Sequence, residues 1–109
     1  MSYEVIAIPN FEREIKKLAK KFPSLKDDFA KLLESLQEEP KIGTSLGNNC
    51  YKIQMAITSK NKGKSGGSRI ITHLKIANKA VYLLSIYDKS EQENISDKEL
   101  EELLREILD

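Results

Sequence analysis

Three cationic side chains, Lys52, Arg69 and Lys89, fall on or just past the ends of adjacent predicted strands, where their charged heads could converge on one phosphate. Cleavage of RNA through its own 2′-hydroxyl needs a base for that hydroxyl, cations around the phosphate and an acid for the departing 5′-oxygen. A lysine can be the base where neighbouring cations depress its pKa, and arginine is the better bidentate ligand for phosphate. The set fits a metal-free ribonuclease, although solvated lysines on a sheet face would show the same spacing.

A basic segment surrounds these residues. Between Pro40 and Tyr87 the chain has no Asp or Glu but eight Lys and Arg residues, three of them in the glycine-broken run Ser59–Ser68. Residues 1–39 hold seven cations against eight acids and residues 88–109 hold three against nine, so the whole chain carries only +1. Such a separation of charge attracts polyanions even at low net charge. We expect a mobile polycation that follows RNA phosphates, formed by Lys60, Lys62 and Lys64.

Other phosphate and metal chemistries fit the chain poorly. Gly63-Lys64-Ser65 resembles the end of a nucleotide-binding P-loop, but the glycine required five residues earlier is Thr58, and the segment leads into a strand rather than a helix. The sheet region lacks the clustered carboxylates of a two-metal nuclease, and one histidine with one cysteine argues against a zinc site. We therefore expect no metal and no small-molecule cofactor.

Size and composition predict one domain, residues 1–109, in the cytoplasm. A chain of this length supports a single core, and 39% hydrophobic with 32% charged residues is typical of a soluble globular protein. There is no apolar run of the roughly 20 residues that a membrane span needs, and no signal-peptide pattern at the start. The lone Cys50 cannot form an internal disulfide, and since it adjoins an apolar strand pattern we expect it in the core or at an edge.

Helical patterns flank a central block of strands. Residues 3–8 predict a short strand, followed by a helix that Asn10 could cap, with apolar residues at i, i+4, i+7 and i+11 from Phe11 to Phe22. Ser24 can cap a second helix, and the short connection predicts a helix hairpin. Ser96-Asp-Lys-Glu99 is a capping box that starts a last helix. The apolar positions of that helix are Leu100, Leu103, Leu104 and Ile107.

The strands in the middle of the chain indicate the fold class. The hydrophobic period changes from 3.6 to 2 in residues 51–57, and residues 69–74 and 80–87 follow as further strands. Ala77-Asn78-Lys79 makes a tight turn between the last two, and such short connections predict an antiparallel sheet. The order β-α-α-β-β-β-α predicts an α+β protein, with a small antiparallel sheet packed against the N-terminal helix hairpin and a C-terminal helix.

Three segments carry motifs that occur together in a known family: Cys50–Met55, Lys62–Ile71 and Tyr82–Glu91. They resemble the RelE/ParE superfamily of toxin–antitoxin toxins, and the glycine-rich basic loop is most similar to its HigB-like branch. The resemblance covers essentially the whole chain. It implies a RelE-like, microbial-ribonuclease type of fold and a ribosome-dependent endoribonuclease that enters the A site and cuts mRNA. It also implies a cognate antitoxin that silences the toxin.

The resemblance implies roles for residues by position. A catalytic lysine of the family falls on Lys52, the phosphate-binding arginine on Arg69, and the basic residue after the last strand on Lys89, where a close RelE has arginine. Two positions depart from the pattern. A second lysine of RelE is replaced by Gln54, and the tyrosine that stacks the substrate base falls on Ile95. The nearest aromatic substitute is Tyr87.

These departures leave other functions open. A ParE-like toxin that inhibits DNA gyrase without cutting RNA would not require the convergent cations. An RNA-binding relative with weakened catalysis would account for Gln54 and Ile95. His73 shares the face of Arg69 in a regular strand, where it could be an acid or a base, or a structural or merely exposed histidine.

Overall fold

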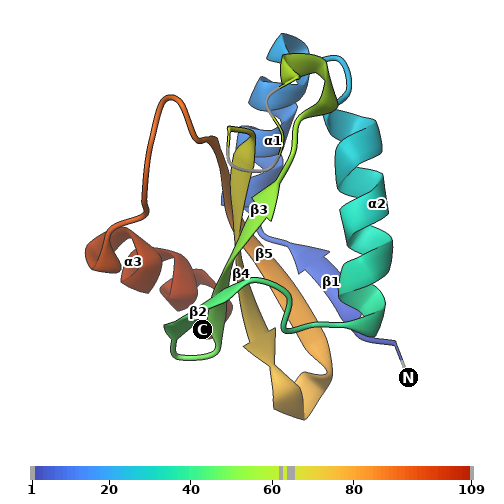
Figure 1. Ribbon diagram of the computed structural model, residues 1–109. Helices are drawn as coiled ribbons and strands as arrows, with labels where there is room; N and C mark the ends of the chain where they lie inside the picture. Colours follow the sequence, from blue (N-terminus) through green and yellow to red (C-terminus); the bar gives the residue numbers. More distant parts are fainter. Residues whose placement is uncertain (1, 62, 64–65, 109) are drawn as a thin grey trace.

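A five-stranded sheet lies between α1 and α2 on one side and α3 on the other (Figure 1). The structure, a computed structural model, describes residues 2–61, 63 and 66–108. In chain order the elements are β1 Glu4–Ala7, α1 Pro9–Lys21, α2 Leu25–Glu38, β2 Thr44–Gly47, β3 Cys50–Met55, β4 Ser68–Lys75, β5 Ala80–Asp88 and α3 Asp97–Leu108. The α+β class is confirmed, and so is the order of the predicted elements; the structure adds β2.

The strand order is β1-β5-β4-β3-β2, and the sheet is mixed rather than wholly antiparallel. β3, β4 and β5 pair antiparallel, as predicted. β1 runs parallel to β5, with Val5 opposite Val81. The prediction of an antiparallel sheet was wrong for this pair. It rested on hairpin-length connections, whereas β1 joins β5 only after both N-terminal helices and three other strands.

β2 is an exposed edge strand that the sequence pattern does not reveal. All four of its residues are exposed, so it has no buried face and no alternation of apolar and polar side chains. Asn48 and Asn49 connect it to β3 with positive φ angles of 51° and 58°. Asparagine tolerates this left-handed conformation, and a two-residue turn of this hand matches the twist of paired strands.

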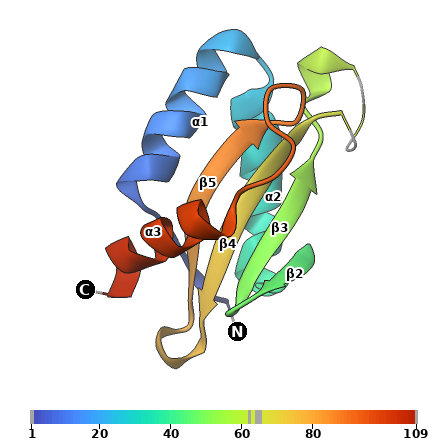
Figure 2. The same ribbon diagram turned by 90° about the vertical axis from the view of Figure 1, so that its left-hand side faces the viewer.

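The helices lie against the sheet (Figure 2). Their apolar stripes form the core with it. Phe11 of α1 stacks at an angle on Phe29 of α2, with ring centroids 5.5 Å apart. Each large apolar side chain buried in this way stabilises the fold by roughly 1.5–3 kcal/mol. Among the described residues, no helix combines the length and apolar character needed to cross a membrane. The buried helix residues are Phe11, Leu18, Leu25, Leu36 and Leu100.

The helix starts follow the sequence in two of three cases. Ser96 accepts a hydrogen bond from the backbone N–H of Glu99 at 3.1 Å, as the capping box predicts. Ser24 occupies the N-cap position of α2 as expected, but its side chain makes no capping hydrogen bond to the helix. The prediction that Asn10 caps α1 was wrong, because α1 begins at Pro9. Proline at a helix start needs no N–H partner, so Asn10 lies inside the first turn with its side chain available elsewhere.

Two side chains of α1 complete the edge of β5 beyond the end of β1. Asn10 Nδ2 donates to the carbonyl oxygen of Leu84 at 3.0 Å. Glu14 Oε1 accepts from the backbone N–H of Ile86 at 3.2 Å and from the Ser85 hydroxyl at 2.8 Å. Burial raises the pKa of Glu14, against the opposing effect of these hydrogen bonds. The side chains of α1 thus pair backbone groups that a longer β1 would have paired.

β5 also contains a bulge opposite the middle of β4. Ile71 pairs with Ser85, but the next residue, Thr72, pairs with Leu83, so Leu84 is an extra residue. Both Leu83 and Leu84 are buried, which a regular two-sided strand would not require. The bulge lies where Asn10 and Glu14 reach the strand.

We expect Glu14→Ala to lower the free energy of unfolding by about 2 kcal/mol, because it leaves the Ile86 N–H and the Ser85 hydroxyl without their acceptor. Urea denaturation followed by circular dichroism measures the change. The matched control is Glu12→Ala, on an exposed position of the same helix, for which we expect a change within about 0.5 kcal/mol. Equal losses in the two variants would contradict the role given to Glu14.

Candidate functional site

The three central strands bring several of the predicted site residues to one face of the sheet. Gln54, Arg69 and Tyr87 lie opposite one another in a row across β3, β4 and β5. Lys52 is two residues from Gln54 on β3, so it projects from the same face. Residues that pair across strands contact one another when they share a face. The sheet register therefore places Lys52 and Arg69 on adjacent strands with the same orientation.

Lys89 lies two residues after Tyr87, just past the end of β5. Its backbone N–H donates to the carbonyl oxygen of Gly67 at 3.0 Å, which extends the pairing of β4 and β5 by one step. Its ammonium is 3.5 Å from Glu93 Oε1, and its side chain is 31% exposed. Lys89 is thus held at the same end of the sheet as Arg69, with its charge accessible from solvent.

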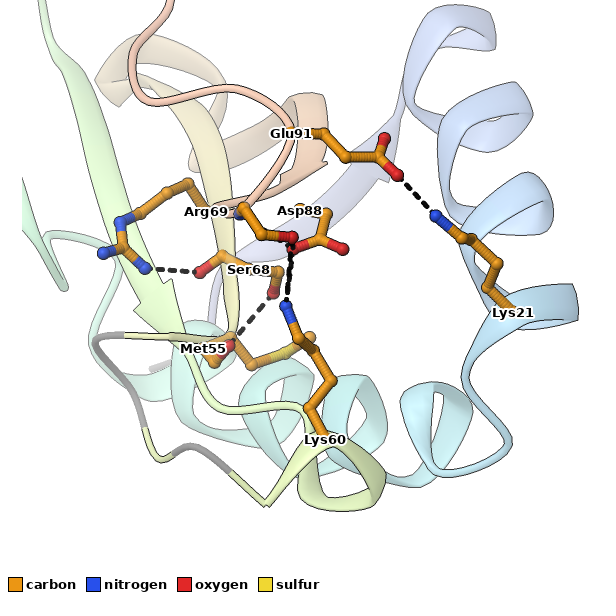
Figure 3. A network of polar contacts seen from close by, with 8 residues as sticks. Lys21, Met55, Lys60, Ser68, Arg69, Asp88 and Glu91 are labelled. Carbon is orange, nitrogen blue, oxygen red and sulfur yellow. Dashed lines mark hydrogen bonds and ion pairs between the residues drawn. The ribbon is translucent and has the colours of Figure 1, made fainter.

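Arg69 is almost completely buried. Only 4% of the residue is exposed, and its Nη1 donates to the carbonyl oxygen of Ser68 at 3.1 Å (Figure 3). Burial raises the pKa of its neighbour Tyr87, and the positive charge of Arg69 opposes that rise. A buried guanidinium is already desolvated, so a phosphate that reached it would meet preorganised donors in a low-dielectric setting.

The segment between β5 and α3 crosses the face of the sheet that bears Lys52 and Arg69. Lys52 Nζ donates to the side-chain oxygen of Asn94 at 3.1 Å. The next residue, Ile95, is partly buried against the core. Lys52 is partly exposed, and its ammonium is hydrogen-bonded to a neutral side-chain amide. A substrate group could therefore replace Asn94 as the acceptor at this nitrogen.

The aromatic and amide positions have contrasting environments. Tyr87 is buried, and its hydroxyl has no hydrogen-bond partner among the described residues. Gln54, at the position where the family carries a second lysine, is exposed beside Arg69. The predicted role of Tyr87 at the substrate stays a prediction, and in this conformation its ring does not offer a free face to a base.

His73 and Cys50 form a contact at the other end of the same face. Cys50 Sγ is 3.5 Å from His73 Nδ1, and the two residues are register partners on β3 and β4. Burial raises the pKa of Cys50 to about 11 and lowers that of His73. A neutral thiol beside a neutral imidazole is a packing contact rather than a nucleophile–base pair. Within the described part of the chain, no three His, Cys, Asp or Glu side chains gather in a way that could hold a metal ion.

Lys60 is an ion-pair partner rather than a solvated cation. Its Nζ is 2.7 Å from Asp88 Oδ1, and the side chains are only 10% and 3% exposed (Figure 3). The same ammonium lies 5.5 Å from the ring centroid of Phe22, which adds a cation–π contact. The expectation of a mobile cation is therefore corrected for Lys60, and its role in RNA binding stays a prediction. Lys62 and Lys64 lie outside the described residues.

The start of the basic run is fastened to α2. Asp28 accepts the backbone N–H of Thr58 at 2.9 Å and its hydroxyl at 2.6 Å. Ser24 donates to Asp28 at 2.9 Å and accepts the N–H of Ser59 at 2.8 Å. Burial by itself raises the pKa of Asp28, but the hydrogen bonds from Thr58 and Ser24 outweigh it and hold the pKa below its ordinary value. These contacts fix the approach to the site from the side of β3.

Sequence reasoning missed Asp28 and Asp88, the two acids that anchor the basic segment. Both stand outside the acid-free stretch, in flanking segments that hold more acids than cations. Asp88 carried one available signal, because it is the first acid after that stretch and directly follows the predicted strand. No local pattern indicated Asp28, since its partner Thr58 is 30 residues away.

Replacing Asp28 by Asn should destabilise the protein in a pH-dependent way. The folded pKa of Asp28 lies below the unfolded one, so its stabilising effect is present above about pH 4 and is lost as the pH falls through the folded pKa. We expect the difference in Tm between wild type and Asp28→Asn to be largest near neutral pH and to shrink below about pH 4.

Thermal unfolding from pH 3 to pH 7 measures this difference. Asp27→Asn is the matched control, since Asp27 is an exposed neighbour in the same helical turn. A pH-independent difference for Asp28→Asn, or an equal one for Asp27→Asn, would contradict the role of the Asp28–Thr58 contact.

Comparisons with known proteins found a matching family model and similar solved structures. A family model described as "RelE toxin of RelE / RelB toxin-antitoxin system" matches residues 10–107. Among solved structures, a mutant of the E. coli toxin RelE in the free state is similar with a TM-score of 0.64 and 21% identity, over 99% of this chain and 100% of that chain. The intact E. coli RelBE toxin–antitoxin complex matches with a TM-score of 0.63 and 21% identity, over 80% of this chain and 96% of that chain.

Proposed function

This chain belongs to the RelE toxin family, and we propose that it stops translation by cutting mRNA in the ribosomal A site. It is a RelE-type toxin of a toxin–antitoxin pair. The observation that carries the nuclease proposal is the common face of Lys52 and Arg69 on adjacent strands, with Lys89 held just past the end of β5. The glycine-rich loop before Arg69 is the reason to place the chain nearest the HigB-like branch.

The proposed reaction is a metal-free transesterification of RNA. Lys52 removes the proton of the 2′-hydroxyl, whose oxygen attacks phosphorus and displaces the 5′-oxygen, and Lys89 supplies the proton to that leaving group. Arg69 holds the non-bridging oxygens, on which negative charge grows in the transition state. Tyr87 borders Arg69 in the row and completes the proposed catalytic group. Lys62 and Lys64 are proposed to bind RNA phosphates.

Two partners follow from this proposal. The first is the ribosome, which would hold the mRNA against a site whose own acid–base set is sparse. Gln54 and Ile95 lack the charge and the ring that would position a substrate, so ordered ribosomal RNA would supply orientation. The second partner is a cognate antitoxin, as the RelBE complex shows for the E. coli toxin. We place this chemistry in the cytoplasm, where translating ribosomes are found.

We expect the purified protein to cut mRNA on translating ribosomes and to leave the same RNA almost intact without them, since an oriented substrate is the main contribution that the site lacks. Mapping of RNA 5′ ends with and without ribosomes measures the difference. Equal cleavage of free RNA would contradict the dependence on the ribosome. No cleavage in either setting, with inhibition of DNA gyrase, would instead indicate the ParE-like activity.

Arg69→Ala should be the most damaging single substitution in the site. Loss of one preorganised donor to the transition state typically costs about 3 kcal/mol, which is on the order of a hundredfold in rate. Arg69→Lys should restore activity only in part, because a point charge cannot replace the two parallel hydrogen bonds of the guanidinium. Growth arrest and the cleavage rate measure the effect.

The matched control is Lys75→Ala, a cation at the opposite end of the same strand. We expect it to leave growth arrest unchanged. Circular dichroism should show that the Arg69 variants fold. A folded Arg69→Ala protein with full toxicity would show that the phosphate is bound elsewhere.

A further inference from the structure

Lys60 and Asp88 form a buried ion pair in which the carboxylate accepts several hydrogen bonds. Three donors meet Asp88 Oδ1, namely Lys60 Nζ at 2.7 Å, the Ser90 N–H at 3.0 Å and the Ser90 hydroxyl at 2.8 Å. Burial on its own raises the pKa of Asp88, but these hydrogen bonds and the charge of Lys60 bring it below the ordinary value. The carboxylate therefore stays ionised and holds its partners in one arrangement.

The Lys60–Asp88 pair lies on the opposite face of the sheet from the proposed site, at the same end of β5. Asp88 stands between Tyr87 and Lys89, and its register partner Ser68 directly precedes Arg69. Successive side chains of a strand alternate between faces, so Asp88 points away from the face that bears Arg69. The contact of Lys60 with Phe22, at the end of α1, agrees with this placement on the side of the sheet covered by α1 and α2.

The ends of three strands meet at this point under tight steric limits. Gly67, whose carbonyl accepts the Lys89 N–H, packs so closely that an added Cβ would lie 2.4 Å from the carbonyl oxygen of Met55. The hydroxyl of Ser68 donates to the same Met55 oxygen at 3.1 Å. A small displacement of the β5 end would therefore carry Lys89 and its neighbours with it.

Net stability alone is a weak reason for such a pair. Removing two charges from water costs about as much as their attraction returns, so well-packed uncharged side chains of similar size often stabilise a fold equally well. What a buried pair with three directed hydrogen bonds does provide is a single geometry. The exposed pair Lys21–Glu91, on the neighbouring part of the same segment, lacks this burial, with side chains 56% and 59% exposed.

We propose that the Lys60–Asp88 ion pair is a positioning device for the RNA-cleaving site, which locks the ends of β4 and β5 from behind so that Arg69 and Lys89 address the same phosphate. The proposal rests on the proposed nuclease function. Lys60 and Asp88 act through their neighbours and do not touch the substrate.

Three variants separate positioning from stability: Asp88→Asn, Lys60→Met and the double variant. Each single variant leaves one buried partner without its counterpart, so both should lose Tm as well as activity. The double variant has no buried charge and should recover a Tm close to that of the wild type. Its kcat for mRNA cleavage on ribosomes should nevertheless stay at least about tenfold low with KM little changed, because a misplaced reacting group slows the chemical step.

The matched control is the double variant Lys21→Met with Glu91→Gln, which removes the exposed ion pair and should leave kcat, KM and Tm unchanged. A Lys60–Asp88 double variant with the kcat of the wild type would show that the pair is merely structural and overturn the proposal. A Lys60→Met variant with raised KM but normal kcat would also overturn it, because Lys60 would then act as the RNA-binding cation expected from the sequence.

A second readout does not depend on cleavage. Hydrogen exchange of the Lys89 amide, which donates to Gly67, should be faster in the Lys60–Asp88 double variant than in the control, at equal Tm. If the wild type failed to cut mRNA, the nuclease function would fall while this measurement still decided whether the pair holds the strand ends. Unchanged exchange at Lys89 would overturn the positioning role itself.

Discussion

The backbone of β5 must be hydrogen-bonded along both of its edges, and most of the architecture follows from how that requirement is met. β4 pairs with one edge over its whole length. β1 covers only the first part of the other edge, and Asn10 and Glu14 of α1 supply the partners beyond it. Since a buried N–H or C=O without a partner is costly, α1 is fixed in place by polar contacts as well as by its apolar stripe. The end of β5 that carries Tyr87 and Asp88 is thereby held from both sides.

Local patterns in the sequence were enough to predict the elements that bury a face. The alternation in β3, the presence of β4 and β5 and the apolar stripes of the three helices were confirmed. Features that depend on distant partners were not predictable in this way. The parallel pairing of β1, the exposed strand β2 and the role of Asn10 at the β5 edge all depend on contacts between remote segments. The burial of Lys60 belongs to the same class, because its partner lies 28 residues away.

Charge shows the same division between local and distant information. The acid-free middle of the chain appears in the sequence as a single basic block. In the folded protein Asp28, from the first segment, accepts a hydrogen bond from Thr58 at the start of the basic run. Asp88, at the start of the acidic segment, forms an ion pair with Lys60. The flanking segments therefore contribute single, directed carboxylates, each at a place where the basic segment must be held. Net charge by segment located the candidate site but could not tell an anchoring lysine from a substrate-binding one.

The bulge at Leu84 changes the phase of β5. Tyr82 pairs with His73 and Tyr87 pairs with Arg69, so these two tyrosines, five positions apart, project from the same face, which strict alternation would forbid. In a family whose members have diverged as far as 21% identity, a one-residue insertion or deletion between them would be easy to overlook in an alignment. Here it would exchange the faces of Tyr87 and Asp88, so that Asp88 would point away from Lys60 and the ion pair could not form. Alignments of such toxins should accordingly be anchored separately on each side of the bulge.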